Sequence, residues 1–145
     1  MKYNRFLIFG LLLLFGYGGC QSDSRIKVIK MGHAQVTAHP VHNAMVFLAK
    51  KLEEKSKGRI RVKVYPNQQL GTERELLELL QIGSLGMTKV SAASLEAFSP
   101  EISVLGLPFL FRDDDHISKV LNGEIGKELL LSCEKFWLRG LCFYD

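Results

Sequence analysis

The sequence predicts an α/β fold in which a mainly parallel sheet is flanked by helices. Residues 59–65 alternate apolar and basic side chains, a period of two that is typical of a β-strand. Residues 72–82 follow with one broad apolar face, which is typical of an amphipathic helix. A similar strand and helix precede them at 26–31 and 40–57. Alternation of strands and helices in this order is characteristic of parallel α/β layers.

Composition limits the size and the partners of the molecule. The 145 residues are 47% hydrophobic, which is enough for one core, and no change in composition marks a second domain. The net charge of +4 is too small to argue for or against nucleic acid. The basic face formed by Arg59, Arg61 and Lys63 lacks interleaved aromatic residues, so we expect a solvated surface and no nucleic-acid partner.

The N-terminus has the pattern of an export signal. Lys2 and Arg5 precede an apolar run at 6–15, and small residues follow it. This run is shorter than the roughly 20 residues that a membrane-spanning helix requires. Residues 1–19 are therefore predicted to be a secretory signal peptide, which places the mature protein in the periplasm or cell envelope.

The end of this signal resembles a lipoprotein cleavage site. Cys20 follows Gly19, as in the bacterial lipobox, although Tyr17 stands where that motif prefers an aliphatic residue. Lipidation of Cys20 would anchor the protein to the membrane surface, and the alternative is ordinary cleavage nearby. The remaining chain is expected to form a short tether at 20–24 and a folded lobe at 25–145.

The first helix has clear start and stop signals. A loop is expected over 32–39, and Pro40 suits the first helical turn, where its missing N–H is not needed. The apolar face continues to about Lys57, and Gly58 provides the left-handed residue that commonly ends a helix.

The second strand and helix are separated by turn residues. Pro66 and Gly71 interrupt the strand pattern. Thr72 and Glu75 then have the spacing of a capping box, in which each side chain binds a backbone N–H of the first turn. A third strand is expected at 85–91.

The last third of the chain is predicted to be mainly helical. A helical turn is expected at 94–98, followed by an irregular apolar segment at 102–111 that is buried on both sides. Helices are expected at 114–121 and 124–136. An apolar segment at 138–144 has the pattern of a further strand.

No residue pattern predicts a metal site. His39 and His42 flank a helix start without a carboxylate at ligand spacing, and His33 belongs to another element. We expect loop and cap roles for them, with His33 best placed to face a pocket just after the first strand. Asp113–Asp115 could suggest a cation site, but three carboxylates before an apolar segment are more typical of a helix N-terminus.

The two remaining cysteines could form a disulfide in an exported protein. Cys133 falls in a predicted helix and Cys142 in a predicted strand, and no Cys-x-x-Cys spacing is present. We expect two buried thiols and no structural zinc site.

Four ordered segments carry a resemblance to a known family. They are LGTEREL at 70–76, QIGSLGM at 81–87, SPEISVLGLPFLF at 99–111 and NGEIGKEL at 122–129. Together they resemble the DctP family of extracytoplasmic solute-binding proteins, which serve tripartite ATP-independent periplasmic (TRAP) transporters. The resemblance covers nearly all of the chain after the export signal.

The resemblance implies a binding protein and not an enzyme, without a cofactor. The implied fold is periplasmic-binding-protein-like, of the type II style, with an organic acid trapped between two α/β lobes and passed to TRAP permease subunits in the membrane. Family members commonly hold the carboxylate with an arginine located beyond the position where this chain ends. We therefore expect most of a first lobe, without the second lobe, and little independent binding by this truncated portion.

By the same resemblance, the first-lobe wall of the pocket would come from three loops. For Thr72 and Glu73, helix capping and first-turn charge are an equally good explanation. The candidate ligand-binding residues are His33, Gln35, Thr72, Glu73, Ser91 and Ser94.

Two alternatives to transport belong to other function classes. A sensory or scaffolding lipoprotein could use the same fold to present a bound ligand to a receptor. A hydrolase finds little support, because the chain has no Gly-x-Ser-x-Gly elbow and no evident base for Ser91 or Ser94.

Overall fold

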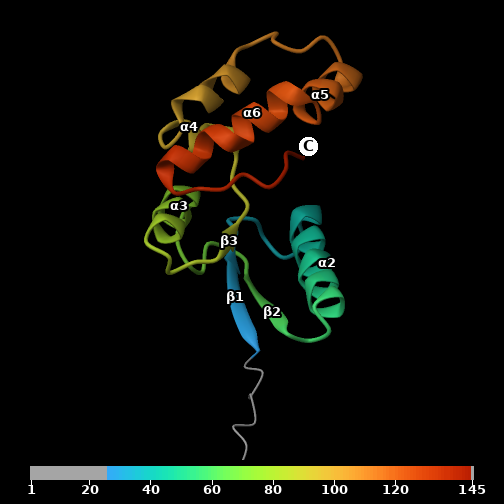
Figure 1. Cartoon of the computed structure of the whole chain (residues 1–145), viewed down its shortest axis with the longest axis vertical. Helices are drawn as coiled ribbons and strands as arrows, with labels where there is room; N and C mark the ends of the chain where they lie inside the picture. Colours follow the sequence, from blue (N-terminus) through green and yellow to red (C-terminus); the bar gives the residue numbers. More distant parts are fainter. Residues whose placement is uncertain (1–25, 145) are drawn as a thin grey trace, which may run out of the picture.

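Three parallel strands form one sheet (Figure 1). The computed structural model describes residues 26–144, so the predicted signal peptide, Cys20 and the tether lie outside the described residues. The strands are β1 (Lys27–Gly32), β2 (Ile60–Tyr65) and β3 (Met87–Thr88), and their spatial order is β2-β1-β3. The predicted α/β class with a parallel sheet is therefore confirmed.

The register shows that β1 is the central strand. It pairs with β2 along its whole length, from Lys27 opposite Ile60 to Gly32 opposite Tyr65. Only Met31 and Gly32 pair with β3. The third strand is thus much shorter than the predicted 85–91, because Ser91 already acts as the N-cap of the next helix.

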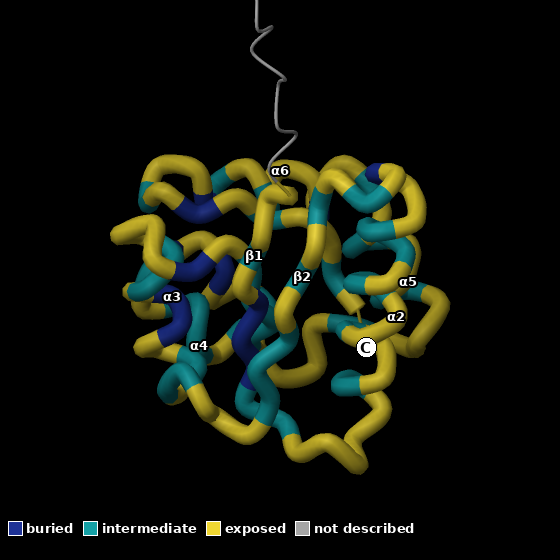
Figure 2. Tube along the Cα trace, turned by 90° about the horizontal axis from the view of Figure 1, so that it is seen from below, coloured by how far each residue is buried: buried dark blue, intermediate teal, exposed yellow. Residues whose placement is uncertain are grey.

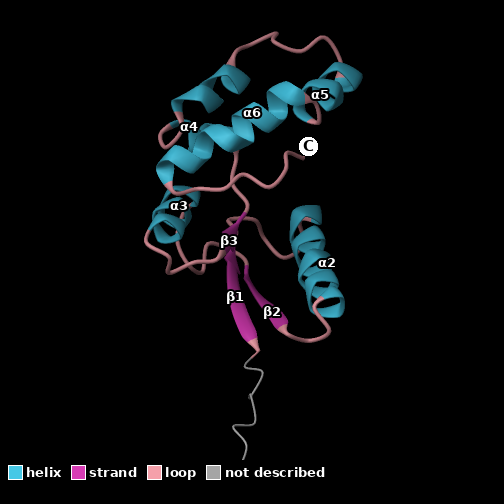
Figure 3. Cartoon of the chain, in the orientation of Figure 1, coloured by secondary structure: helices cyan, strands magenta, loops and turns pink. Residues whose placement is uncertain are grey.

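The first helix, α2 (Pro40–Lys55), packs against β2 (Figure 3). It ends two residues earlier than predicted, and Lys57 and Gly58 follow it with positive φ angles of 54° and 76°. The Ser56 hydroxyl accepts a hydrogen bond from the Ile60 N–H at 2.9 Å. This contact joins the end of the helix to the start of β2.

The second helix, α3 (Glu73–Gln81), begins with the predicted capping box. The Thr72 hydroxyl accepts from the Glu75 N–H at 3.4 Å, and the Glu75 carboxylate accepts from the Thr72 N–H at 2.7 Å. Leu76 and Leu77 on its inner face are almost completely buried. Gly83 follows the helix with a φ of 73°, so the predicted stop is confirmed.

The remaining described elements are helical. Asp113 accepts a hydrogen bond from the His116 N–H at 2.7 Å, so it caps a helix as predicted. The helix predicted at 124–136 is divided into an α-helix and a short 3-10 helix. The elements are α4 (Ala92–Glu96), η1 (Pro100–Gly106), α5 (Asp114–Leu121), α6 (Glu124–Ser132) and η2 (Cys133–Phe136).

A small core joins α3 to these helices. Figure 2 shows that much of the trace is exposed or only partly buried, and α2 contributes no fully buried residue. The buried cluster contains Leu77, Ile102, Leu129, Cys133 and Leu138.

The strand predicted at 138–144 is wrong. This segment has no regular secondary structure and pairs with no described strand. Leu138 is buried, and Gly140 lies so close to Leu130 of α6 that an added Cβ would meet that side chain at 2.5 Å. The segment is therefore held by side-chain packing on α6 instead of backbone pairing in the sheet.

The apolar segment 102–111 is buried only at its beginning. Ile102 lies in the core, whereas Leu107 is 55% exposed and Phe109 is completely exposed. The 3-10 helix directs its first turn inward, and the chain then runs over the surface after Gly106. The prediction of burial on both sides is thus wrong beyond that turn.

The cysteine prediction is correct for one residue of two. Cys133 is buried and Cys142 is exposed, and neither forms a disulfide. Cys142 belongs to the unpaired segment that follows η2. Among residues 26–144, no helix has both the length and the apolar character needed to cross a bilayer.

Candidate functional site

Polar side chains gather at the edge of the sheet where all three strands end. Because the strands are parallel, His33 after β1 and Lys89 after β3 follow strands that end at the same edge. Helices α2 and α3 begin after β1 and β2 on this side. Carboxyl edges of parallel sheets are the usual place for ligands in open α/β folds, because helix N-termini favour negative charge there.

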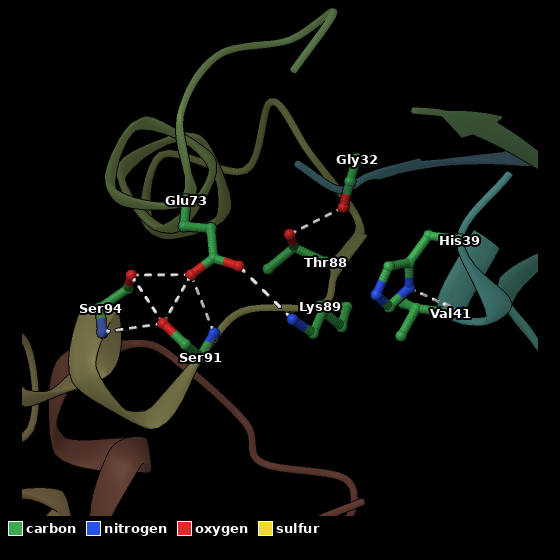
Figure 4. A network of polar contacts seen from close by, with 8 residues as sticks. All are labelled: Gly32, His39, Val41, Glu73, Thr88, Lys89, Ser91 and Ser94. Atoms are coloured by element: carbon green, nitrogen blue, oxygen red, sulfur yellow. Dashed lines mark hydrogen bonds and ion pairs between the residues drawn. The ribbon is translucent and has the colours of Figure 1, made fainter. Parts of the chain in front are cut away.

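Glu73 organises one part of this edge (Figure 4). Its Oε2 atom accepts hydrogen bonds from the Ser91 N–H at 2.9 Å and from the Ser91 and Ser94 hydroxyls at 2.7 Å each. The Ser91 hydroxyl in turn accepts from the Ser94 N–H at 3.3 Å. Three of the six predicted site residues are therefore in direct contact.

Lys89 faces the other oxygen of the same carboxylate. Its Nζ atom lies 3.5 Å from Glu73 Oε1, and the two side chains are only 13% and 15% exposed. The Tyr144 ring also lies near the ammonium, with its centroid 5.7 Å from Nζ. A nearly buried cation thus stands at the carboxyl edge of the sheet.

The pKa of the Glu73 carboxyl is lowered although burial acts against ionisation. Desolvation raises this pKa, but the hydrogen bonds from Ser91 and Ser94 and the charge of Lys89 together lower it by a larger amount. The net result is a pKa below the ordinary value of 4.5. Glu73 is therefore ionised at neutral pH.

A histidine pair lies next to Lys89. His33 is fully buried, and its Nε2 atom is 3.1 Å from Nδ1 of His42 in α2. Burial lowers the pKa of His33 below 6.5, and the charges of His42, Lys89 and His39 act in the same direction. The other ring nitrogen, Nδ1, is buried without a hydrogen-bond partner among the described residues.

The other predicted site residues have structural contacts. The Thr72 hydroxyl is used by the α3 capping box. Gln35 is partly buried, and its carbonyl accepts from the Asn67 N–H at 3.0 Å, which joins the loops after β1 and β2. His39, for which a loop or cap role was predicted, does cap α2, because its Nδ1 atom accepts from the Val41 N–H at 3.2 Å. These contacts favour scaffold roles for Thr72 and His39.

Sequence reasoning missed Lys89 and His42 as members of this cluster. The signal for Lys89 was a single charge within the apolar stretch around the third strand, directly before Val90. The signal for His42 was weaker, because its contact with His33 depends on how α2 packs on the sheet. Within residues 26–144, no group of three or more His, Cys, Asp or Glu side chains is arranged to hold a metal ion.

Comparison with known proteins places this chain in a family of binding proteins. Residues 31–145 match the DctP family, described as "Bacterial extracellular solute-binding protein, family 7". The match covers most of the chain, so the chain belongs to this family. Its members are solute-binding proteins and not enzymes.

Two curated relatives show how much of such a protein is present. The C4-dicarboxylate-binding protein DctB of Bacillus subtilis is 37% identical over 117 residues, which are 81% of this chain and 33% of the relative. The C4-dicarboxylate-binding periplasmic protein DctP of Rhodobacter capsulatus is 36% identical over 122 residues, which are 81% of this chain and 36% of the relative. The chain thus spans about a third of their length.

Solved structures of TRAP periplasmic solute-binding proteins share the fold. One from Bradyrhizobium, in complex with galacturonate, is 39% identical with a TM-score of 0.78, over 82% of this chain and 40% of its own. One from Sulfurospirillum deleyianum, with bound succinate, is 33% identical with a TM-score of 0.71, over 77% of this chain and 36% of its own. The parallel sheet with its helices therefore matches one part of these receptors.

Proposed function

We propose that this chain forms part of an extracytoplasmic receptor that captures a carboxylate-bearing small molecule for a TRAP transporter. The observation that carries the proposal is the nearly buried ammonium of Lys89 at the carboxyl edge of the sheet. A fixed cation beside the starts of α2 and α3 provides favourable electrostatics for an anion. Family membership provides the class of function.

The ligand class follows from the relatives. Those solved with galacturonate are 36% and 39% identical to this chain, and a relative solved with succinate is 33% identical. We propose a sugar acid as the first candidate and a C4-dicarboxylate as the second. The shared chemistry is a carboxylate attached to a small polar body.

The proposed partners are TRAP permease subunits and, through Cys20, the membrane surface. In this account residues 1–19 direct export and the protein acts in the periplasm or cell envelope. Mass spectrometry of the protein expressed in a bacterial host tests the anchor, because lipid attached to Cys20 would be lost in Cys20→Ser. Permease genes beside the gene for this chain would support transport, whereas a neighbouring histidine kinase gene would favour the sensory alternative.

We expect this chain alone to bind its ligand weakly, because it spans about a third of the length of the receptors that hold such ligands. Titration of the ¹⁵N-labelled full chain with galacturonate, succinate and galactose tests the function. The acids should shift the backbone amides of Lys89, Ser91 and His33 at millimolar concentration, and neutral galactose should not. Equal shifts of these amides with galactose and with the acids would contradict the proposed preference for a carboxylate.

A further inference from the structure

Positive charge is concentrated in the first strand, helix and strand of the described chain. Residues 26–63 contain nine Lys and Arg side chains against two acidic ones, a net charge of +7. Residues 64–144 contain seven against eleven, a net charge of −4. The small total charge therefore conceals two regions of opposite sign, and a strongly basic region attracts a partner of opposite charge.

The register of the sheet brings part of this charge to one face. Side chains alternate between the two faces of a strand, and paired residues of neighbouring parallel strands lie on the same face. Lys30 of β1 is opposite Lys63 of β2, and Val28 is opposite Arg61. All four side chains are exposed, so this face of the sheet is open to solvent next to β1 and β2.

The amino edge of the sheet continues this charged face. The Lys27 N–H donates to the Arg59 carbonyl at 2.8 Å, so these residues lie side by side where β1 and β2 begin. Lys57 lies in the turn between α2 and β2, directly before Gly58. We call this region the basic surface, and its exposed residues are Lys27, Lys30, Lys57, Arg59, Arg61 and Lys63.

The basic surface has little acidic compensation. Within residues 26–144, Arg61 is the only member that forms an ion pair, with Glu53 at 3.4 Å. Lys30 and Lys63 are like charges at facing positions of neighbouring strands, an arrangement that is destabilising. An anionic partner would relieve this repulsion. A face intended for a protein core would carry mainly apolar side chains instead.

Two features favour a membrane as this partner. Ile26 and Val28 are 47% and 49% exposed beside the lysines of β1, and apolar side chains among basic ones suit the boundary between lipid headgroups and acyl chains. No aromatic side chain stands between the basic residues of 27–30 or 57–63, as stacking on nucleic-acid bases would require.

The proposed anchor is on the same side of the molecule. β1 and β2 begin at the end of the sheet where α2 finishes (Figure 1). Cys20 precedes Ile26 by six residues, which span roughly 20 Å when fully extended. A lipid on Cys20 would therefore hold the amino edge close to the bilayer.

We propose that the basic surface docks on an anionic lipid membrane. The inference rests on the proposed location in the cell envelope and deepens it, because it adds a second membrane contact to Cys20. One acyl anchor alone binds weakly and reversibly, and a basic surface strengthens the attachment. The candidate site lies at the opposite edge of the sheet, so docking leaves it accessible.

The test measures co-sedimentation of the mature chain, residues 20–145, with lipid vesicles. Cys20→Ser removes the lipidation site, so only the protein surface contributes. Vesicles of equimolar phosphatidylglycerol and phosphatidylcholine should bind the chain, and the binding should decrease as the salt concentration increases. Vesicles of phosphatidylcholine alone should bind it weakly. Equal binding to both would assign the contact to exposed apolar side chains and would overturn the proposal.

Substitutions locate the contact. Lys30→Gln together with Lys63→Gln should weaken binding to the anionic vesicles about tenfold or more, since each basic side chain near such a membrane contributes about fivefold in affinity. The matched control is Arg112→Gln with Lys119→Gln, which removes the same charge from exposed positions in the acidic part of the chain. The control should bind nearly as well as the wild type. Equal losses in the two variants would show that net charge alone decides, and the basic surface would be refuted.

A second measurement needs no substitution of a lysine. Acetylation quantified by mass spectrometry should slow at Lys30, Lys57 and Lys63 when anionic vesicles are present, and it should stay unchanged at Lys119 and Lys127. Uniform protection of all five lysines, or protection of none, would overturn the proposal. This assay decides the question if the double variant fails to fold.

Other outcomes separate the proposals. Tighter binding of a single-stranded oligonucleotide than of anionic vesicles at the same salt concentration would overturn lipid as the partner. Titration with galacturonate, succinate and galactose reports on the opposite edge of the sheet. Loss of vesicle binding therefore refutes the basic surface alone, whereas equal amide shifts with galactose and the acids contradict the proposed carboxylate preference alone.

Discussion

Glu73 is the residue whose contacts explain most of the local order at the carboxyl edge. It joins α3 to the loop after β3 through Lys89, Ser91 and Ser94, although these residues are far apart in sequence. Burial alone would raise the pKa of the Glu73 carboxyl, but the hydrogen bonds from Ser91 and Ser94 reverse this effect. Its ionised form therefore stabilises the fold.

Glu73→Gln should lower the free energy of unfolding by about 1–2 kcal/mol at neutral pH, because hydrogen bonds to a charged acceptor are lost. A carboxyl with a lowered pKa stabilises the folded state above 4.5, and the contribution disappears as the pH falls through the folded-state pKa. The difference between variant and wild type should therefore shrink below pH 4.5. Urea denaturation at several pH values measures it.

The matched control for this change is Glu128→Gln, since Glu128 is an exposed glutamate of α6. Its effect should stay within about 0.5 kcal/mol, as is usual for surface substitutions. Equal effects of the two substitutions at neutral pH would show that the Glu73 network does not stabilise the fold.

His33 should make the free energy of unfolding depend on pH in a range above the one in which Glu73 acts. Its pKa is lowered from 6.5, so the unfolded chain takes up a proton that the folded chain resists. Stability should consequently fall as the pH decreases from 6.5 towards 4.5, where Glu73 begins to contribute. His33→Gln should flatten this part of the curve. An unchanged slope in the variant would contradict the assignment.

At the scale of elements, the ends of α2 and α3 follow from local chemistry. Pro40 and Gly58 bracket the first helix, and Thr72 with Glu75 starts the second, because capping depends on nearby residues alone. Such features are predictable from sequence for this reason.

Thr72→Ala should destabilise α3 locally by about 1 kcal/mol, since the cap hydroxyl is lost. Hydrogen exchange of the α3 amides should become faster by about fivefold, as that free energy implies. The amides of α5, which Asp113 caps, serve as the internal control and should not change. Unchanged exchange in α3 would show that its start does not depend on the capping box.

Elements that depend on distant partners were predicted less well. Residues 138–144 have a strand-like pattern, but a pattern does not say whether another strand is available for pairing, and this segment packs on α6 instead. The third strand was predicted too long because the cap formed by Ser91 directs the chain into α4. The periodicity of a sequence shows which face of a helix or strand is apolar, but it does not show which other element packs against that face.

The candidate site was also predicted only in part, because some of its contacts depend on residues that are distant in the sequence. Glu73, Ser91 and Ser94 were found because the family resemblance points to those loops, and the structure brings them together. Lys89 was not found, since the value of a charge in an apolar run depends on which side chains surround it. Only the fold shows that Glu73 lies beside it.

At the scale of the whole molecule, large apolar side chains lie on the surface of the described residues. Phe47 is 61% exposed, Trp137 85%, Leu141 68% and Phe109 fully. Apolar surface of this kind promotes association and dye binding. Many of these side chains are on helices or segments outside the small core.

The purified chain should therefore bind the dye ANS under native conditions and self-associate as its concentration increases. Trp137→Ser together with Phe109→Ser should reduce both effects without changing the secondary structure seen by circular dichroism. Fluorescence and sedimentation velocity measure the two effects. A monomer that binds no ANS would contradict this description of the surface.

The central claim is that this chain carries one wall of a carboxylate-binding receptor, and a chimera tests it most directly. Residues 31–145 would replace the matching part of the galacturonate-binding relative from Bradyrhizobium, and calorimetry would measure sugar-acid and dicarboxylate binding. The account predicts a folded chimera that binds at least one of these acids. A folded chimera that binds none of them would contradict it.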